Sequence, residues 1–412
     1  DGLLVLAVAP QPQAVEITFS KEFVAGRSAD SMIDRRGIVL LEAWYPLPLA
    51  ESEVRLNAEI PADFYAVSEA DDMTYTEQGT TKKVSFRFAH PLPFVHFVAG
   101  PYELREEVLP GGTILATYFF PEDRELAGLY GAKTKEYLAR YEKLIGPYPY
   151  KRYSVVENRL PTGFAMPTFT LLGQSVVRLP FITETSLGHE VLHSWFGNAV
   201  AVDHGQGNWC EGLTTYLADQ AFAGDKGEGV DFRKGQLVKY QSVVAHDNAS
   251  AVRDFQDAGD YGTISLATRA IGYNKVSMIF HMLRQRLGDD IFFAALRNFY
   301  EEKKFQRASW DDLRRHFAQA SGKDLTVFFD QWLNRPDVPG LSVDKGRLEV
   351  KDGNPELRFE LMQEGDIPYQ LTVPVRIKAG KEIIDRNIEV TGGRTPVTFS
   401  FTTMPSELVI DP

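Results

Sequence analysis

The chain of 412 residues has one cysteine, no long apolar run and no excess of positive charge. A single cysteine, Cys210, excludes an internal disulfide, and a leader removed upstream would leave no trace, so the cell compartment stays open. No apolar stretch approaches the roughly twenty residues of a membrane-spanning helix, so we expect no such segment. Acidic residues outnumber basic ones, 56 to 44, and the net charge of −12 argues against nucleic acid and acidic membrane surfaces as partners.

The run His189-Glu-Val-Leu-His193 is the most specific signal that the chain does contain. Residues four apart on a helix share a face, so both imidazoles are expected to point toward one ion. Catalytic zinc takes three protein ligands and leaves a position for water, which a nearby carboxylate can deprotonate. Glu190 is the candidate for that base. Because so short a pattern also arises by chance, the interpretation depends on a third ligand.

Glu211 is the candidate third ligand. It follows His193 after seventeen residues, and Gly207–Leu217 reads as a turn that opens a second helix with Glu211 in its first turn. A helix N-terminus favours an acidic side chain. The alternative is a glutamate that only compensates the helix dipole. The favoured interpretation is a zinc site that holds one Zn²⁺ ion between His189, His193 and Glu211.

The residues around these ligands resemble a known family. His189–Asn198, followed by Trp209-Cys-Glu-Gly212, is similar to the gluzincin aminopeptidases, the family of aminopeptidase N and leukotriene hydrolase. The resemblance extends to Ala270–Met278, where the family holds a tyrosine that stabilises the oxyanion of the tetrahedral intermediate. Tyr273 matches that tyrosine, and a phenol can donate to such an oxyanion without titrating near neutral pH. Its alternative role is a core aromatic in an apolar helix.

Two departures from the family pattern affect the predicted specificity. The loop between His193 and Glu211 is one residue shorter than usual. Where the family has Gly-Ala-Met-Glu-Asn, the chain has Phe164-Ala-Met-Pro-Thr168, so Pro167 replaces the glutamate that pairs with the substrate's free α-ammonium. Proline offers neither charge nor a backbone donor. Cleavage at the amino terminus, implied by the resemblance, and internal cleavage, favoured by Pro167, therefore both stay open.

The segment Gly163–Leu172 is apolar and is expected to form one extended strand beside the zinc. Four of its residues are candidates to align a peptide substrate by strand addition, namely Gly163, Phe164, Ala165 and Met166. The alternative is a buried core strand. Glu157 and Glu42 are two guesses for a replacement of the missing amine anchor.

The order of patterns predicts a multidomain α+β fold. Residues 1–120 contain short alternating runs of an antiparallel β domain, including Val15–Phe19 and Val84–Phe88, and a hairpin joining Val95–Leu109 to Thr113–Phe120. Residues 121–336 change to helical periodicity and form the thermolysin-like, mainly α catalytic domain that the resemblance implies. Its zinc helix is expected at about 183–197, and a further helix at 266–287. Residues 337–412 return to strands and predict a β-sandwich.

Several functions remain in competition at this stage. The favoured one is zinc-dependent peptide hydrolysis; a non-catalytic binding or scaffold protein on a peptidase fold is an alternative of another class. Ester or epoxide hydrolysis is a third, by analogy with leukotriene hydrolase. The start at Asp1 and a first β domain that looks short for the family also fit a fragment of a longer protein. No pattern indicates the oligomeric state.

Overall fold

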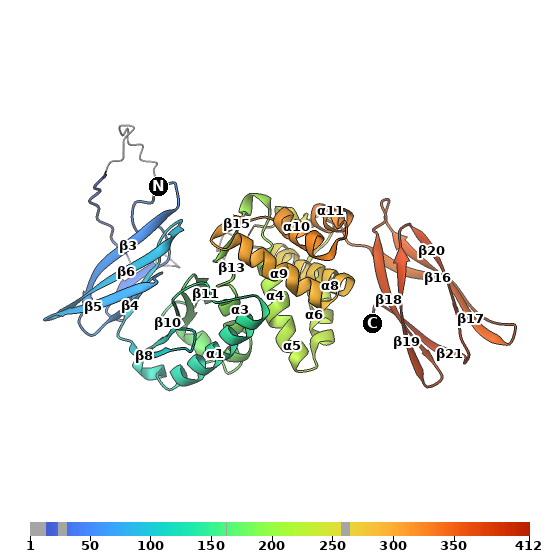
Figure 1. Ribbon diagram of the computed structural model, residues 1–412, viewed down its shortest axis with the longest axis horizontal. Coiled ribbons are helices and arrows are strands. Elements are labelled where there is room, and N and C mark those ends of the chain that lie inside the picture. Colours follow the sequence, from blue (N-terminus) through green and yellow to red (C-terminus); the bar gives the residue numbers. More distant parts are fainter. Residues whose placement is uncertain (1–13, 24–30, 162, 257–263) are drawn as a thin grey trace. The chain divides into compact units, whose positions relative to one another are not determined.

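The computed structural model describes residues 14–23, 31–161, 163–256 and 264–412 (Figure 1). Two compact units divide the chain: one contains residues up to 140 together with 148–194, and the other contains 141–147 together with the residues from 195 onward. The fold is mixed α+β, with N-terminal sheets, a central helical region and C-terminal strands, as the sequence predicts. The three domains at 1–120, 121–336 and 337–412 stay a prediction.

In its described residues, the first unit contains three β-sheets. Their strand orders are β1-β2-β7-β4, β3-β6-β5 and β11-β12-β10-β9-β8. The strands are β1 (Ser31–Asp34), β2 (Gly37–Leu40), β3 (Ser52–Pro61), β4 (Tyr65–Val67), β5 (Asp72–Gln78), β6 (Thr81–Leu92), β7 (Phe97–Gly100), β8 (Glu103–Val108), β9 (Ile114–Phe119), β10 (Arg152–Asn158), β11 (Gly163–Met166) and β12 (Phe169–Gly173).

Alternating side chains build the core of the first two sheets. Val84, Phe86 and Phe88 of β6 are buried and alternate with exposed neighbours, which confirms the predicted strand. The prediction of a strand at Val15–Phe19 is wrong, because these residues have no regular structure and their apolar side chains are about half exposed. Alternation alone does not form a strand unless a partner strand receives its hydrogen bonds.

The predicted hairpin around residues 110–112 is confirmed in β8 and β9, which pair antiparallel from Val108↔Ile114 to Glu103↔Phe119. Its first arm is shorter than expected. Phe97–Gly100, which the prediction included in that arm, forms β7 in a different sheet. Tyr102 ends the stretch between the two strands, and its ring stacks on Phe120 at a centroid distance of 4.8 Å.

The five-stranded sheet corrects the prediction of one strand over Gly163–Leu172. The chain instead forms a hairpin, with β11 antiparallel to β12 in the register Met166↔Phe169, so Pro167 and Thr168 make a two-residue turn. Proline presets the backbone for a turn and cannot donate to a ladder, so the strand ends there. β12 and β10 are parallel and fully buried, whereas β11 is the terminal strand of this sheet.

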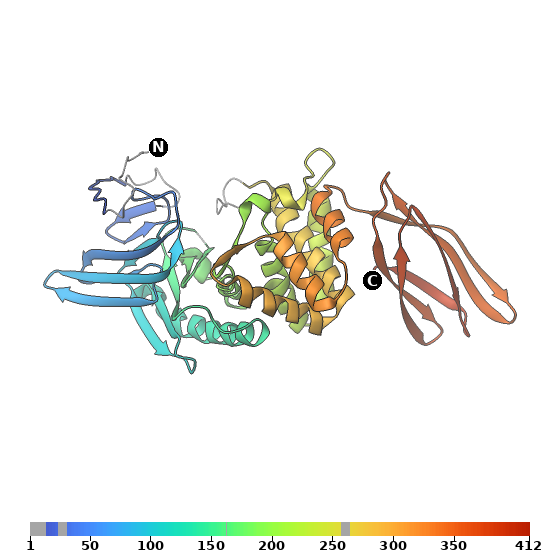
Figure 2. The same ribbon diagram turned by 45° about the horizontal axis from the view of Figure 1, so that its top comes forward.

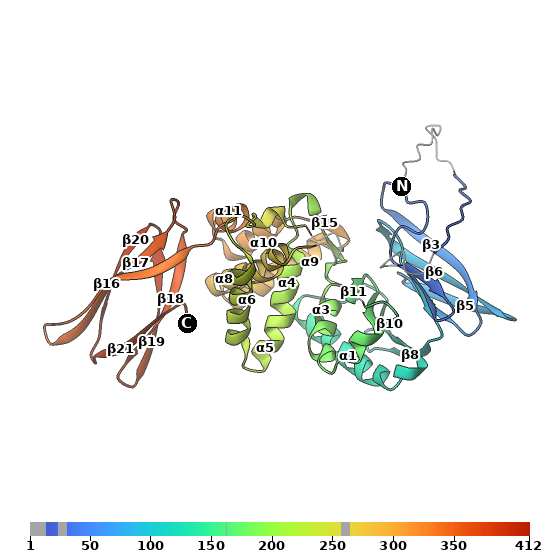
Figure 3. The ribbon, with the colours of Figure 1, turned by 180° about the vertical axis from the view of Figure 1, so that it is seen from behind.

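Helices follow these sheets and make up most of the second unit up to residue 334 (Figure 3). The α-helices are α1 (Leu126–Leu144), α2 (Gln174–Val177), α3 (Ser186–Leu192), α4 (Cys210–Thr215), α5 (Ala221–Asp225), α6 (Gly229–Val243), α7 (Leu266–Arg269), α8 (Val276–Leu287), α9 (Asp289–Lys303), α10 (Trp310–Ser321) and α11 (Thr326–Asn334). Two π-helices interrupt this region, η4 (Tyr216–Gln220) and η6 (Ala270–Lys275). The 3-10 helices are η1 (Pro121–Asp123), η2 (Ile182–Glu184), η3 (His204–Gln206) and η5 (Val252–Asp254).

A small parallel sheet, β13-β14-β15, accompanies the helices; its strands are β13 (Phe196–Gly197), β14 (Val200–Val202) and β15 (Gln306–Ala308). Within the described residues, no helix combines the length and apolar character required to cross a membrane.

The C-terminal strands form the predicted β-sandwich (Figure 2). One sheet has the order β16-β17-β20 and the other β19-β18-β21, and all pairs are antiparallel. The strands are β16 (Gly340–Lys351), β17 (Asn354–Glu364), β18 (Leu371–Ala379), β19 (Glu382–Val390), β20 (Arg394–Ser400) and β21 (Pro405–Ile410). Buried residues of both sheets, among them Leu361, Val375 and Ile377, share one core, as expected for sheets packed face to face.

Candidate metal centre

Helix α3 presents the first two candidate ligands. It spans Ser186–Leu192 and is shorter than the predicted 183–197, because residues after His193 turn into strand β13. His193 is the C-cap but keeps helical dihedrals, and its N–H donates to the carbonyl of His189 at 3.4 Å. The i, i+4 geometry is therefore preserved, and the two imidazole rings lie 4.9 Å apart between centroids.

Glu211 lies in the first turn of α4, as the sequence predicts. Asn208 precedes the N-cap residue Trp209, and its side-chain oxygen accepts a hydrogen bond from the Cys210 N–H at 2.8 Å, which satisfies one of the donors left unpaired at the helix N-terminus. Trp209 is fully buried, and its indole N–H donates to the Ala308 carbonyl at 2.8 Å. These bonds fix the backbone on the N-terminal side of Glu211.

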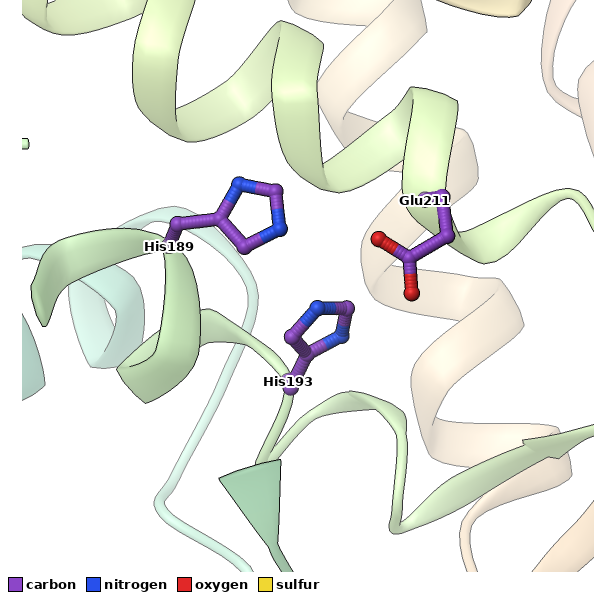
Figure 4. A group of neighbouring side chains, drawn as sticks. All are labelled: His189, His193 and Glu211. Carbon is purple, nitrogen blue, oxygen red and sulfur yellow. The ribbon is translucent and has the colours of Figure 1, made fainter. Parts of the chain in front are cut away.

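The structure brings the three candidate ligands together (Figure 4). Their ligand atoms all lie within 4.8 Å of one another, and no other group of three His, Cys, Asp or Glu side chains in the described residues meets this spacing. Figure 4 shows the two imidazoles and the Glu211 carboxylate around a common centre. His193 and Glu211 are largely buried, with exposed fractions of 7% and 9%.

This donor set fits zinc. Two imidazole nitrogens and one carboxylate oxygen are a ligand combination of catalytic zinc sites, which keep a fourth position for water or substrate. Zinc bonds of 2.0–2.2 Å separate the ligand atoms of a tetrahedral site by roughly 3.4 Å. The upper limit of 4.8 Å on the present separations is of the same order.

Glu190 lies beside the edge strand β11. Helix α3 contacts β11, and a Cβ atom added at Gly163 would lie 3.9 Å from the Glu190 Oε1 atom. Burial raises the pKa of the Tyr153 phenol, and the negative charge of Glu190 raises it further, so Tyr153 stays neutral beside this carboxylate. The candidate base is thus adjacent to the strand that the sequence assigns to substrate alignment.

The four candidate substrate residues occupy the whole of β11. Gly163, Phe164 and Ala165 are partly exposed, whereas Met166 is buried in the core with Phe164 packed against it. Met166 therefore has the core role that the sequence left as an alternative. Because β11 is the terminal strand of its described sheet, its outer edge has the geometry that a peptide can extend.

Tyr273 lies in the π-helix η6, which interrupts the helix that the sequence predicts over 266–287. It is 8% exposed, its ring lies edge-on to Phe255, and the Arg269 guanidinium lies 4.6 Å from its ring centroid. Helix α4, which carries Glu211, contacts η6. π-Helical turns are frequent at functional sites because the extra residue re-aims a side chain.

Of the two guessed amine anchors, Glu157 lacks the expected surroundings and Glu42 stays a prediction. Glu157 is fully buried and accepts a hydrogen bond from the Phe120 N–H at 2.8 Å. Burial, followed by the neighbouring Asp123, raises the pKa of Glu157 to about 8, so it holds its proton at neutral pH and carries no charge for an ammonium. Glu42 is exposed and follows the end of β2.

Cys210 is buried, and its thiol donates to the Phe196 carbonyl.

Sequence reasoning missed the residues that set the packing around these groups. Gly212, Gly272 and Lys275 belong to the motifs already quoted, but only their neighbours in space show what they do. A Cβ atom at Gly272 would lie 2.1 Å from the Phe255 ring, so no side chain fits there. The available signal was a glycine next to each of two candidate residues, Gly212 after Glu211 and Gly272 before Tyr273.

Comparisons with known proteins agree with this architecture. Residues 180–332 match the family model described as Peptidase family M1 domain. The chain is also similar in fold to the crystal structure of Legionella pneumophila aminopeptidase A in complex with aspartic acid, with a TM-score of 0.70, 17% identity, and coverage of 92% of this chain and 47% of that one. The fold and the matched domain together define a peptidase architecture.

Similar sequences are aminopeptidases. Mouse aminopeptidase B is 26% identical over 77% of this chain and 51% of its own length, and Arabidopsis thaliana aminopeptidase M1 is 23% identical over 81% and 39%. Lactococcus lactis aminopeptidase N is 29% identical over 38% of this chain and 19% of its own length. These matches support the M1 family of gluzincin aminopeptidases as the family that the chain resembles. It spans about half or less of the length of these relatives.

Proposed function

We propose that the chain is a zinc-dependent peptidase that hydrolyses peptide bonds. The observation that carries the proposal is the group of His189, His193 and Glu211, whose ligand atoms lie within 4.8 Å of one another inside the matched peptidase domain. These three residues would hold one Zn²⁺ ion. Zinc supplies Lewis-acid activation of a water molecule and of the substrate carbonyl.

Two residues of the chain, Glu190 and Tyr273, carry out the remaining steps of the hydrolysis. Glu190 takes a proton from the attacking water, whose oxygen bonds to the carbonyl carbon, and then passes a proton to the leaving amine as the C–N bond breaks. Tyr273 donates a hydrogen bond to the oxyanion that develops on the former carbonyl oxygen. Its buried position supports this role, because a hydrogen bond in a desolvated site is stronger than one in water.

Strand β11 would align the peptide. Backbone hydrogen bonds along its outer edge hold an extended chain in register, and the partly exposed Gly163, Phe164 and Ala165 contact the substrate. Gly163 lies beside the Glu190 carboxylate, since a Cβ atom there would be in van der Waals contact with Oε1 at 3.9 Å. Main-chain hydrogen bonds do not depend on the side chains of the substrate, so peptides of many sequences can be aligned in this way.

The similar proteins favour removal of amino-terminal residues, because those cited are aminopeptidases. One observation favours a second candidate, cleavage that needs no free amino terminus. Pro167 stands at the position of the family's amine-binding glutamate and forms the turn that ends β11, where it offers neither charge nor a donor.

The test is digestion of a peptide mixture by the zinc-loaded protein, with each peptide supplied with a free and with an acetylated amino terminus. Cleavage of free termini alone supports the aminopeptidase, and equal cleavage of both supports the second candidate. Zinc content is measured in parallel for wild type and His189→Ala. Wild-type protein that binds no zinc and cleaves nothing would instead support a non-catalytic scaffold.

A further inference from the structure

Lys275 ends the π-helix that carries Tyr273, and its ammonium is buried. The residue is 6% exposed, and Nζ donates to the carbonyl oxygens of Arg335, Pro336 and Asp337 at 3.1, 3.4 and 3.1 Å. An ammonium has three N–H donors, so all three have a partner. Burial lowers the pKa of Lys275 to about 8, and the nearby Asp337 carboxylate opposes this shift. A buried charge is retained at such a cost only where its hydrogen bonds are made.

The segment that accepts these bonds is fixed to the β-sandwich. Arg335 pairs with the Asp337 carboxylate at 3.1 and 2.6 Å, and its guanidinium lies 3.6 Å from the Tyr369 ring centroid. The Tyr369 hydroxyl lies 2.8 Å from the Asp337 carbonyl oxygen and 3.1 Å from its carboxylate. Tyr369 belongs to the loop between β17 and β18, so this loop and Lys275 both contact Arg335 and Asp337.

A second set of contacts holds helix α11 on the same loop. Gln331 and Gln370 exchange two hydrogen bonds of 2.9 Å, from the Gln331 side-chain amide to the Gln370 carbonyl and from the Gln370 N–H to the Gln331 side-chain oxygen. The rings of Trp332 and Tyr369 lie 4.9 Å apart. The loop between β17 and β18 therefore contacts both the segment that Lys275 binds and the end of α11 just before it.

The π-helix itself is held by its other neighbours on each side of Tyr273. Asn274 donates to the Gln236 carbonyl of α6 at 3.2 Å, and Gly272 packs against the Phe255 ring. These two contacts restrain the backbone on either side of the tyrosine. Lys275 ties η6 to residues 335–337, the segment that leads into the sandwich.

We propose that Lys275 is a positioning residue that aims the Tyr273 phenol by tying the π-helix to the docked β-sandwich. The proposal rests on the function proposed above, in which Tyr273 supports the oxyanion. Under this proposal the sandwich contributes to the geometry of the site, because Tyr369 and Gln370 keep the carbonyls that bind Lys275 in place. A displacement of about 1 Å at a catalytic group is enough to reduce turnover about a hundredfold.

The experiment is a double-mutant cycle on the zinc-loaded protein with Lys275→Met, Tyr273→Phe and the double variant. Methionine keeps the length and apolar stem of lysine but has no donor. We expect Lys275→Met to lower kcat about tenfold to a hundredfold at nearly unchanged KM and zinc content, and the double variant to be no slower than Tyr273→Phe alone. Lys275→Arg, which keeps the charge and the donors, should recover most of the loss.

The matched control is Lys82→Met. Lys82 is also buried and also donates to a main-chain carbonyl, that of Phe64 at 3.1 Å, but it lies in the N-terminal strand β6. It should lose thermal stability without a change in kcat. If Lys275→Met fails to fold, Tyr369→Phe is the second variant: it removes one hydroxyl from the far end of the same network and should lower kcat while KM stays constant.

Two outcomes would overturn the proposal: a Lys275→Met protein with wild-type kcat, or a double variant whose loss equals the product of the two single losses. Hydrogen exchange gives a readout independent of turnover, since amides of residues 270–276 should exchange faster in Lys275→Met and unchanged exchange would contradict the tie. A wild-type protein without peptidase activity, or a fully active Tyr273→Phe variant, would instead refute the proposed function.

Discussion

Gly212, the residue directly after Glu211, packs on Val276, the first residue of α8: a Cβ atom added at Gly212 would lie 2.1 Å from Val276 Cγ1. It would also lie 2.9 Å from the carbonyl oxygen of Gly272, the residue before Tyr273. Gly212, next to the candidate zinc ligand, thus lets α4 approach the helix of the candidate oxyanion donor at backbone distance, whereas Gly272 makes room for the Phe255 ring. This contact sets the spacing of Glu211 and Tyr273.

The first prediction follows from that contact. Gly212→Ala should lower stability by about 1–3 kcal/mol or more, because an extra carbon in a packed interface forces the two helices apart, and it should weaken zinc retention. Thermal unfolding and metal analysis after dialysis measure both effects. Gly235→Ala is the control, since Gly235 lies within α6 and its added Cβ meets nothing within 4 Å. Equal behaviour of the two variants would contradict the packing argument.

Glu190→Gln should keep zinc and the fold but lose turnover by several orders of magnitude, because the amide has nearly the same shape and cannot accept the proton of the attacking water. Single-substrate kinetics with metal analysis of the same sample give the answer. Glu136→Gln serves as control, since that carboxylate is mostly exposed and pairs with Lys133 on α1. An active Glu190→Gln protein would show that another group is the base.

Pro167→Glu should raise the preference for peptides with a free amino terminus, because it restores an acidic group where the family carries one. A charge-assisted hydrogen bond of about 1.5–3 kcal/mol corresponds to a rise of roughly tenfold or more in the ratio of kcat/KM for free over acetylated peptides. Pro167→Gln is the control of equal size without the charge. The idea fails if both variants shift the ratio equally, since loss of the proline would then be the cause.

Glu157 predicts a loss of stability at alkaline pH. Its pKa in the folded protein is about 8, above its ordinary value of 4.5, so the folded state keeps a proton that the unfolded state loses. The contribution of Glu157 to the free energy of unfolding is therefore greatest below pH 4.5 and is lost as the pH rises through 8. Glu157→Gln mimics the protonated form and should be more stable than wild type at pH 9, with a flatter profile between pH 5 and 9.

Urea unfolding across that pH range tests this prediction. Glu125→Gln is the control, because its side chain is 87% exposed and should leave the slope unchanged. If the unfolding free energy of Glu157→Gln had the same pH dependence as that of wild type, a residue other than Glu157 would be the one that retains the proton.

The local part of the candidate site could be predicted from sequence because helix geometry fixes it. Residues four apart share a face of a helix, so His189 and His193 had to point the same way, and Glu211 followed from a turn signal and the helix that it opens. The structure brings these three together, and their roles as zinc ligands stay a prediction. The sandwich and the β8–β9 hairpin also followed from alternation and turn residues.

What the sequence could not show depends on contacts between segments far apart in the chain. An apolar run such as Gly163–Leu172 fits one strand or two, and the pairing of β12 with β10 decided for a hairpin at Pro167. From the sequence alone, Glu157 could be an ordinary ionised carboxylate, whereas its burial in the folded protein raises its pKa so that it keeps a proton at neutral pH. The π-helix at Tyr273 and the bonds of Lys275 likewise depend on Phe255, Gln236 and the sandwich. Side-chain spacing along one helix is a local property, whereas burial, charge state and aim are set by neighbours that only tertiary packing supplies.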